Sequence, residues 1–133
     1  MRDKKRCVGC KNVKSHSEFY ASTRCEDGLN RYCVQCCKVN RSLEGVRKRD
    51  KTSKISFRQR HRAKLLGVEC DDTITLALVF KERLGVCALC GEWVQPRYAS
   101  IDHTHPLSLG GTHTWSNVQL THLKCNLRKG ARI

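Results

Sequence analysis

The sequence has no apolar run long enough to cross a membrane. The longest, residues 76–80, is far shorter than the ~20 residues of a spanning helix. Residues 1–6 lead directly into Cys7 without an apolar stretch, so we expect no secretory signal peptide. Aromatic residues make up only 6% of the chain, which argues against a nucleic-acid surface built on base stacking.

Acidic residues are also scarce. The chain has 12 Asp and Glu against 26 Lys and Arg, for a formal net charge of +14. Zinc binding by the cysteine sites described below would lower this charge and still leave it strongly positive. A polyanionic partner such as nucleic acid is therefore the first expectation. We expect no membrane association, because no strongly apolar helix face accompanies the charge.

Cysteine, by contrast, is abundant, with 10 in 133 residues. Two Cys-x-x-Cys pairs and a mixed pair are spaced as metal half-sites rather than as a disulfide framework, which favours a reducing cytoplasm. The first site is expected to be a closed structural zinc site in an N-terminal knuckle, with the ligands Cys7, Cys10, Cys33 and Cys36. We expect Cys25, Cys37 and Cys70 to be free thiols, although Cys25 or Cys37 could replace an assigned ligand.

A second structural zinc site is expected near the C-terminus, with the ligands Cys87, Cys90, His122 and Cys125. His122 and Cys125 are three residues apart, so on a helix they would share one face. Two alternatives remain open here. His122 could lie on the surface beside a buried Cys125, or it could bind a catalytic metal, since it lies one turn from Asn126.

Residues 38–64 form a strongly basic segment in which the only acidic residues are Glu44 and Asp50. No proline interrupts it, and it is expected to be helical with a sparse apolar stripe. One interpretation is a solvated helical linker. The other is an arm that neutralises phosphates without reading bases, with the contacts Arg58, Arg60, Arg62 and Lys64. The two interpretations are compatible.

The remaining elements follow from local signals. We expect a helix over residues 74–84, beginning after Asp71-Asp72-Thr73, and a strand over residues 98–103. A loop with Gly110-Gly111 should follow, and then a helix from residue 118 to about 129, capped by Asn117.

Within this region the chain reads Ile101-Asp102-His103, then Gly110-Gly111, Asn117, and finally His122-x-x-Cys125-Asn126-x-x-Lys129-Gly130. This string resembles the HNH endonucleases of ββα-metal architecture, in the short form found in phage-encoded nucleases. The knuckle at Cys7–Cys36 is similar, more loosely, to those that often precede such domains. The resemblance implies a small, zinc-stabilised α+β protein with an N-terminal knuckle (residues 1–40), a basic helical linker (41–70) and an HNH domain (71–133).

By this resemblance His103 is the general base and Asn117 braces the loop. The third position, often His, falls on Asn126, so the chain is an HNN variant. Asp102 and Asn126 match the metal-ligand positions, and their hard oxygen atoms suit Mg²⁺ or Mn²⁺. Together with two structural Zn²⁺, these are the expected cofactors.

The residue types fit phosphodiester hydrolysis. A neutral His103 can take a proton from water, and neighbouring residues on a strand should point their side chains apart, so that base and metal address opposite sides of one phosphate. Lys129 is a candidate phosphate contact, and Arg128 and Arg132 are weaker ones. His113 could support the site, contact phosphate or simply be exposed.

We therefore expect a metal-dependent DNA endonuclease, a phosphodiester hydrolase that is phage-encoded and acts in the cytoplasm of a bacterial host. A homodimer or a phage packaging partner is compatible with this function. The alternative is a non-catalytic, zinc-containing DNA-binding regulator or packaging accessory protein. Such a protein would share the basic segment and both zinc sites but would have no use for Asp102, His103 and Asn126.

Overall fold

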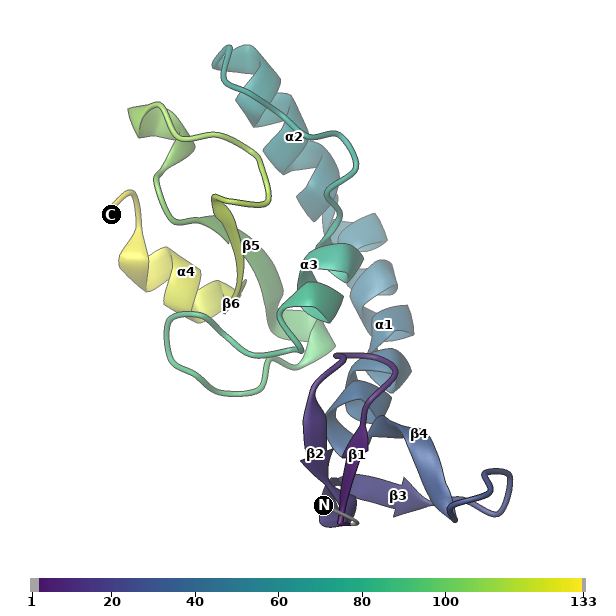
Figure 1. The fold of residues 1–133 in the computed structure, drawn as a ribbon. Helices are drawn as coiled ribbons and strands as arrows, with labels where there is room; N and C mark the ends of the chain where they lie inside the picture. The colour runs from purple at the N-terminus through teal and green to yellow at the C-terminus, as the bar shows by residue number, and fades with distance from the viewer. Residues whose placement is uncertain (1–2, 133) are drawn as a thin grey trace. The chain divides into compact units, whose positions relative to one another are not determined.

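The computed structural model describes residues 3–132, which divide into two compact units, one up to Arg41 and one from Ser42 onward. Helix α1 (Val34–Ser53) runs from the first unit into the second. Figure 1 shows short strands together with helices, so the predicted small α+β class is confirmed. Within the described residues no helix has the length and apolar character needed to span a membrane.

The first unit consists of two small antiparallel hairpins and the start of α1. Strand β1 (Lys4–Arg6) pairs with β2 (Val13–Ser15), and β3 (Phe19–Ala21), which follows the 3-10 turn η1 (His16–Glu18), pairs with β4 (Leu29–Cys33). Its buried apolar side chains are few: Phe19, Val39 and three cysteines of the predicted zinc site, Cys7, Cys33 and Cys36. So small a core depends on additional cross-links for stability.

The second unit is built around a hairpin of β5 (Ala99–His103) and β6 (Val118–His122), connected through a loop that contains the 3-10 turn η3 (Leu107–Leu109). Helices α2 (Ile55–Leu65), α3 (Leu76–Glu82) and α4 (Leu123–Lys129) contact this hairpin, and Figure 1 shows α4 alongside it. A further 3-10 turn, η2 (Pro96–Tyr98), precedes β5. The sequence β5, β6, α4 is the ββα arrangement that the resemblance implied.

The basic helices are attached to β5 and to the start of α3 by specific hydrogen bonds. Arg49 on α1 donates to the Ala99 carbonyl at 2.9 Å, and Arg60 on α2 donates to the Ile74 carbonyl at 3.1 Å. The Ser56 hydroxyl accepts from the Leu76 backbone at 2.8 Å. Although α1 and α2 are rich in charge, part of each helix is therefore packed and fixed in position.

Two sequence-based expectations about helices need correction. The helix predicted from residue 118 begins only at Leu123, because residues 118–122 form an extended strand that pairs with β5. Asn117 consequently precedes a strand and caps no helix. The helix predicted over residues 74–84 is shorter, because Thr75 is its N-cap residue and accepts from the Leu78 backbone at 3.3 Å.

Candidate active site and metal centres

Asp102 and His103 stand at the end of β5, and both are largely buried, with 5% and 6% of their surface exposed. They lie on the wall of a pocket of about 300 Å³ within the second unit. The pocket also draws residues from α2, the η3 loop and α4: Gln59, Arg62, Ile101, Pro106, Leu107, Ser108, Asn126, Leu127, Lys129, Gly130 and Ala131. The fold thus brings the predicted base, both predicted ligands of the catalytic metal and Lys129 to one place.

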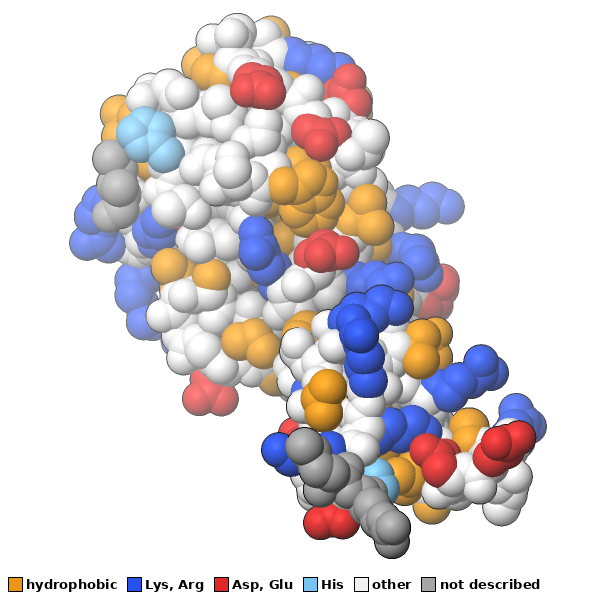
Figure 2. Space-filling model, in the orientation of Figure 1, with side chains coloured by type: hydrophobic (Ala, Val, Ile, Leu, Met, Phe, Trp, Pro, Cys, Tyr) orange, Lys and Arg blue, Asp and Glu red, His pale blue; other side chains and the backbone are white. Residues whose placement is uncertain are grey.

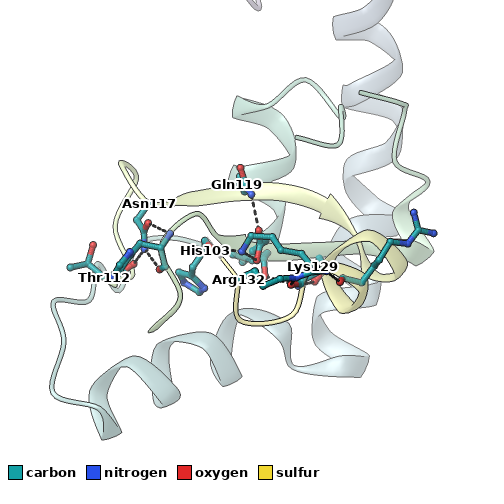
Figure 3. Close-up of polar contacts among 12 residues, drawn as sticks. His103, Thr112, Asn117, Gln119, Lys129 and Arg132 are labelled. Carbon is teal, nitrogen blue, oxygen red and sulfur yellow. Dashed lines mark hydrogen bonds and ion pairs between the residues drawn. The ribbon is translucent and has the colours of Figure 1, made fainter. Parts of the chain in front are cut away.

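Asp102 is held by one donor at each carboxylate oxygen. Gln119, its register partner on β6, donates to Oδ2 at 2.7 Å, and Lys129 lies with Nζ 3.3 Å from Oδ1 (Figure 3). Lys129 also donates to the His103 carbonyl at 3.0 Å. The Lys129 side chain therefore spans the two residues, and its ammonium charge balances a buried carboxylate.

His103 is arranged as a neutral imidazole. Burial and the neighbouring His113, with smaller effects of Arg62 and Lys129, outweigh the opposing Asp102 carboxylate and lower the pKa of His103 to about 4. Its Nε2 lies 2.9 Å from Nδ1 of His113. With Nε2 engaged in this way, Nδ1 of His103 is the ring atom left to act on a substrate or water in the pocket.

His113 is a site residue whose role the sequence left open. It is completely buried, and burial together with the nearby Arg60 lowers its pKa. The only sequence signal for it was its position after the double glycine, which says nothing about contact with His103. That contact depends on how the loop folds back, and no local pattern encodes it.

Asn117 braces the loop that follows His103. Its Oδ1 accepts from the His105 backbone at 2.8 Å, while its Nδ2 donates to the carbonyls of His105 at 2.9 Å and Thr112 at 2.7 Å (Figure 3). A Cβ atom at Gly111 would overlap the His105 carbonyl, so the backbone needs glycine there. The Asn117 side chain thus links His105 and Thr112 within the loop, and it does not line the pocket.

Asn126 lies on α4 and faces the same pocket as Asp102. Its amide nitrogen donates to the Ser100 hydroxyl at 3.0 Å and approaches the Ile101 carbonyl at 3.4 Å. Because the nitrogen is the atom turned toward β5, the amide oxygen is the atom suited to binding a cation. Asp102 and Asn126 together offer the hard oxygen donors that Mg²⁺ or Mn²⁺ prefers.

Some of the predicted phosphate contacts line the pocket and others lie outside it. Arg62 lines the pocket, and so does Gln59, which the sequence did not single out. Arg60 donates a hydrogen bond to the Ile74 carbonyl, and Lys64 forms an ion pair with Asp72 at 2.9 Å. Arg58 and Arg128 are exposed outside the pocket lining.

The second cysteine cluster has the geometry of a metal centre. The ligand atoms of Cys87, Cys90, His122 and Cys125 all lie within 4.8 Å of one another. Nδ1 of His122 faces the cluster, 3.4 Å from the Cys90 sulfur, while its Nε2 lies 3.0 Å from the Trp93 carbonyl. A carbonyl that fixes the second ring nitrogen is the usual support of a histidine ligand, so this set could hold zinc.

Burial, backbone donors and neighbouring side chains shift the pKa values of the thiols in this cluster. Burial disfavours the Cys87 thiolate, but backbone donors of Cys90, His122 and Leu89 outweigh burial and lower its pKa to about 6. Burial and the neighbouring Cys90 and Cys87 raise the pKa of Cys125 to about 11. A divalent cation bound by the sulfur atoms would offset the electrostatic repulsion between neighbouring thiolates.

The N-terminal cluster repeats this pattern. The sulfur atoms of Cys7, Cys10, Cys33 and Cys36 also lie within 4.8 Å of one another. Burial opposes ionisation of Cys7, yet backbone donors, including Cys33 at 3.2 Å and Gly9 at 3.3 Å, lower its pKa to about 6. Burial and the neighbouring thiols raise the pKa of Cys36. This set, too, could bind zinc.

Comparison with known proteins gives one family. Residues 87–132 match the model of the family described as HNH endonuclease. The matched segment holds the second cysteine cluster, β5, β6 and α4, and therefore all the pocket residues except those of α2. None of the curated proteins compared with the chain matches it.

Proposed function

Residues 87–132 match the HNH endonuclease family, and from this premise we propose that the chain is a metal-dependent DNA endonuclease. The observation that carries the proposal is the pocket itself. A histidine kept neutral by burial lies beside a buried carboxylate, with an amide and an ammonium group on the same wall. Phosphodiester hydrolysis requires these groups: a base for water, oxygen ligands for a cation and a positive charge for the phosphate.

Each residue then has one role. Nδ1 of His103 accepts the proton of the attacking water. Asp102 and Asn126 would hold Mg²⁺ or Mn²⁺, which when bound would neutralise charge on the phosphate and the departing 3′ oxygen. Lys129 and Arg62, which both line the pocket, contact the phosphate, and Asn117 keeps the loop after His103 in place. The resemblance implies products with a 5′ phosphate and a 3′ hydroxyl.

The basic surface supports nucleic acid as the substrate. Figure 2 shows Lys and Arg side chains on the surface of both units. In our proposal Arg58 and Arg128 contact DNA outside the pocket, Arg62 contacts the phosphate near the cleaved bond, and Arg60 and Lys64 add positive charge while held by Ile74 and Asp72. Such contacts bind without reading sequence, so affinity should fall steeply with salt.

Several finer expectations belong to the same proposal: two structural zinc ions, a division into knuckle, basic helical segment and HNH domain, and a phage-encoded protein acting in the host cytoplasm. A homodimer or a packaging partner would give a single site access to the second strand. The competing function is the non-catalytic DNA-binding regulator or packaging accessory protein, which would use the same basic surface and zinc sites.

Separate measurements of binding and cleavage on one short labelled duplex distinguish the two functions. Wild-type protein should bind the duplex with salt-sensitive affinity and cleave it when Mg²⁺ or Mn²⁺ is added. His103→Ala should bind equally well and cleave at least ~10²-fold more slowly, the usual size of a general-base contribution. Binding without cleavage by the wild type, in either metal, would instead favour the accessory protein.

A further inference from the structure

His113 is a buried histidine with one engaged ring nitrogen and one unpaired ring nitrogen. Nδ1 lies 2.9 Å from Nε2 of His103, with the two rings tilted by 52°. Nε2 is buried and has no hydrogen-bond partner among the described residues. An unpaired polar atom in a protein interior is destabilising, and an apolar side chain at this position would avoid that cost. The sequence therefore keeps a polar ring where packing alone does not require one.

The backbone of His113 is fixed by a segment that precedes the HNH-matched residues. Its N–H donates to the Glu69 carbonyl at 2.8 Å, and its carbonyl accepts from the Asp71 N–H at 2.8 Å. Cys70 and His113 are thus bridged as on adjacent parallel strands. Residues 69–71 hold the backbone of His113 from outside the β5–β6 hairpin, so the place of this residue does not depend on the loop alone.

The proton positions follow from what a base requires. His103 can accept a proton from water through Nδ1 only if that atom carries a lone pair, which places the ring hydrogen on Nε2. Nε2–H then needs an acceptor, and among residues 3–132 the group at hydrogen-bond distance is Nδ1 of His113. His113 must in turn carry its hydrogen on the unpaired Nε2. Both rings are neutral in this arrangement.

We propose that His113 is a positioning residue that selects the reactive tautomer of His103 and fixes its ring orientation. This inference rests on the proposed function, because it assigns a role to a neighbour of the proposed base. His113 takes no proton from substrate and contacts no phosphate. It acts only by accepting the His103 Nε2 hydrogen, as an orienting group does behind other catalytic histidines.

Two substitutions of similar shape separate hydrogen bonding from packing. Leucine and asparagine have the same branched arrangement of side-chain heavy atoms, but Asn carries an oxygen acceptor at the δ position and Leu does not. At saturating metal and DNA, His113→Leu should lower kcat at least about tenfold, part of the ~10²–10⁴ that a general base contributes. His113→Asn should retain most of the activity. DNA affinity and the metal requirement should stay unchanged, and His16→Leu, a histidine of the first unit, should behave as wild type.

The ¹⁵N signals of the His103 ring in wild-type protein report the tautomer directly, whether or not a variant folds. We expect the hydrogen on Nε2 in the wild type and a mixture of tautomers in His113→Leu. A hydrogen on Nδ1 in the wild type would overturn the inference, as would equal cleavage by folded Leu and wild-type proteins or equal loss in folded Leu and Asn variants. If the wild type cleaves no DNA, the proposed function fails and the inference fails with it. If the wild type cleaves and His113→Leu cleaves as fast, only the inference fails.

Discussion

The ammonium group of Lys129 lies 3.3 Å from Oδ1 of Asp102, at the carboxylate that the proposed nuclease uses to bind its metal. Both side chains are largely buried, and the lysine is also tied to the His103 carbonyl at 3.0 Å. A lysine and a divalent cation would share this carboxylate, and each would weaken binding of the other by charge repulsion. We therefore expect Lys129 to affect both metal affinity and catalysis, in opposite directions.

Replacing Lys129 by methionine separates these effects. Lys129→Met should lower the Mn²⁺ concentration needed for half-maximal cleavage, because a competing charge is gone. The maximal rate should fall by about 10²-fold, the usual cost of losing one charged group at a reacting centre. A Mn²⁺ titration of cleavage measures both, and Lys124→Met, an exposed lysine on the same helix, is the control. A higher metal requirement in Lys129→Met would contradict the proposed competition.

Removing either proposed ligand of the catalytic metal should change the metal requirement in the opposite direction. Asp102→Ala and Asn126→Ala remove oxygen donors, so each should raise the metal concentration needed for half-maximal cleavage, with the larger effect at the charged ligand. Isothermal titration of Mn²⁺ into zinc-loaded protein checks this without relying on turnover. Unchanged metal binding in both variants would mean that the site is misplaced.

The activity should persist at mildly acidic pH. A base is active when unprotonated, and with its pKa lowered to about 4, His103 remains so at pH 6. A histidine with an ordinary pKa of about 6.5 would be only about one-quarter unprotonated at that pH. We expect kcat/KM at saturating metal to be nearly the same at pH 6 and 7.5, with circular dichroism verifying that the zinc-dependent fold persists. A roughly fourfold fall would indicate a base with an unshifted pKa.

Zinc content tests the two cysteine clusters independently. Elemental analysis should find two zinc ions per wild-type chain and one in Cys36→Ser, because a cluster with one thiolate missing binds zinc far more weakly. Cys25→Ser, which lies outside both clusters, should keep two. Loss of zinc from the first unit should also lower its helix content, since that unit has little apolar core besides the cysteines. Full zinc content in Cys36→Ser would exclude Cys36 as a ligand.

The sequence could predict those parts of the site that depend on spacing. Cysteine and histidine residues a few positions apart form a pattern that can be read from the sequence, and so does Asp102 next to His103. The local signals of residues 118–122 predict a helix, whereas the structure has a strand there. Its pairing with β5 is a long-range contact that overrides those local signals. Gln59 and Arg62 reach the pocket from α2, and His113 contacts His103 through a folded loop. No short-range pattern in the sequence predicts that these residues come so close to the site.

The most direct test of the account is conversion of supercoiled plasmid by purified protein in Mg²⁺, Mn²⁺ or EDTA, beside His103→Ala. The account predicts nicked or linear product only in the presence of added metal, and at least ~10²-fold slower conversion by the variant. Intact plasmid in every condition, with salt-sensitive binding retained, would contradict it. So would equal conversion by wild type and variant, which would locate the activity outside the His103 pocket.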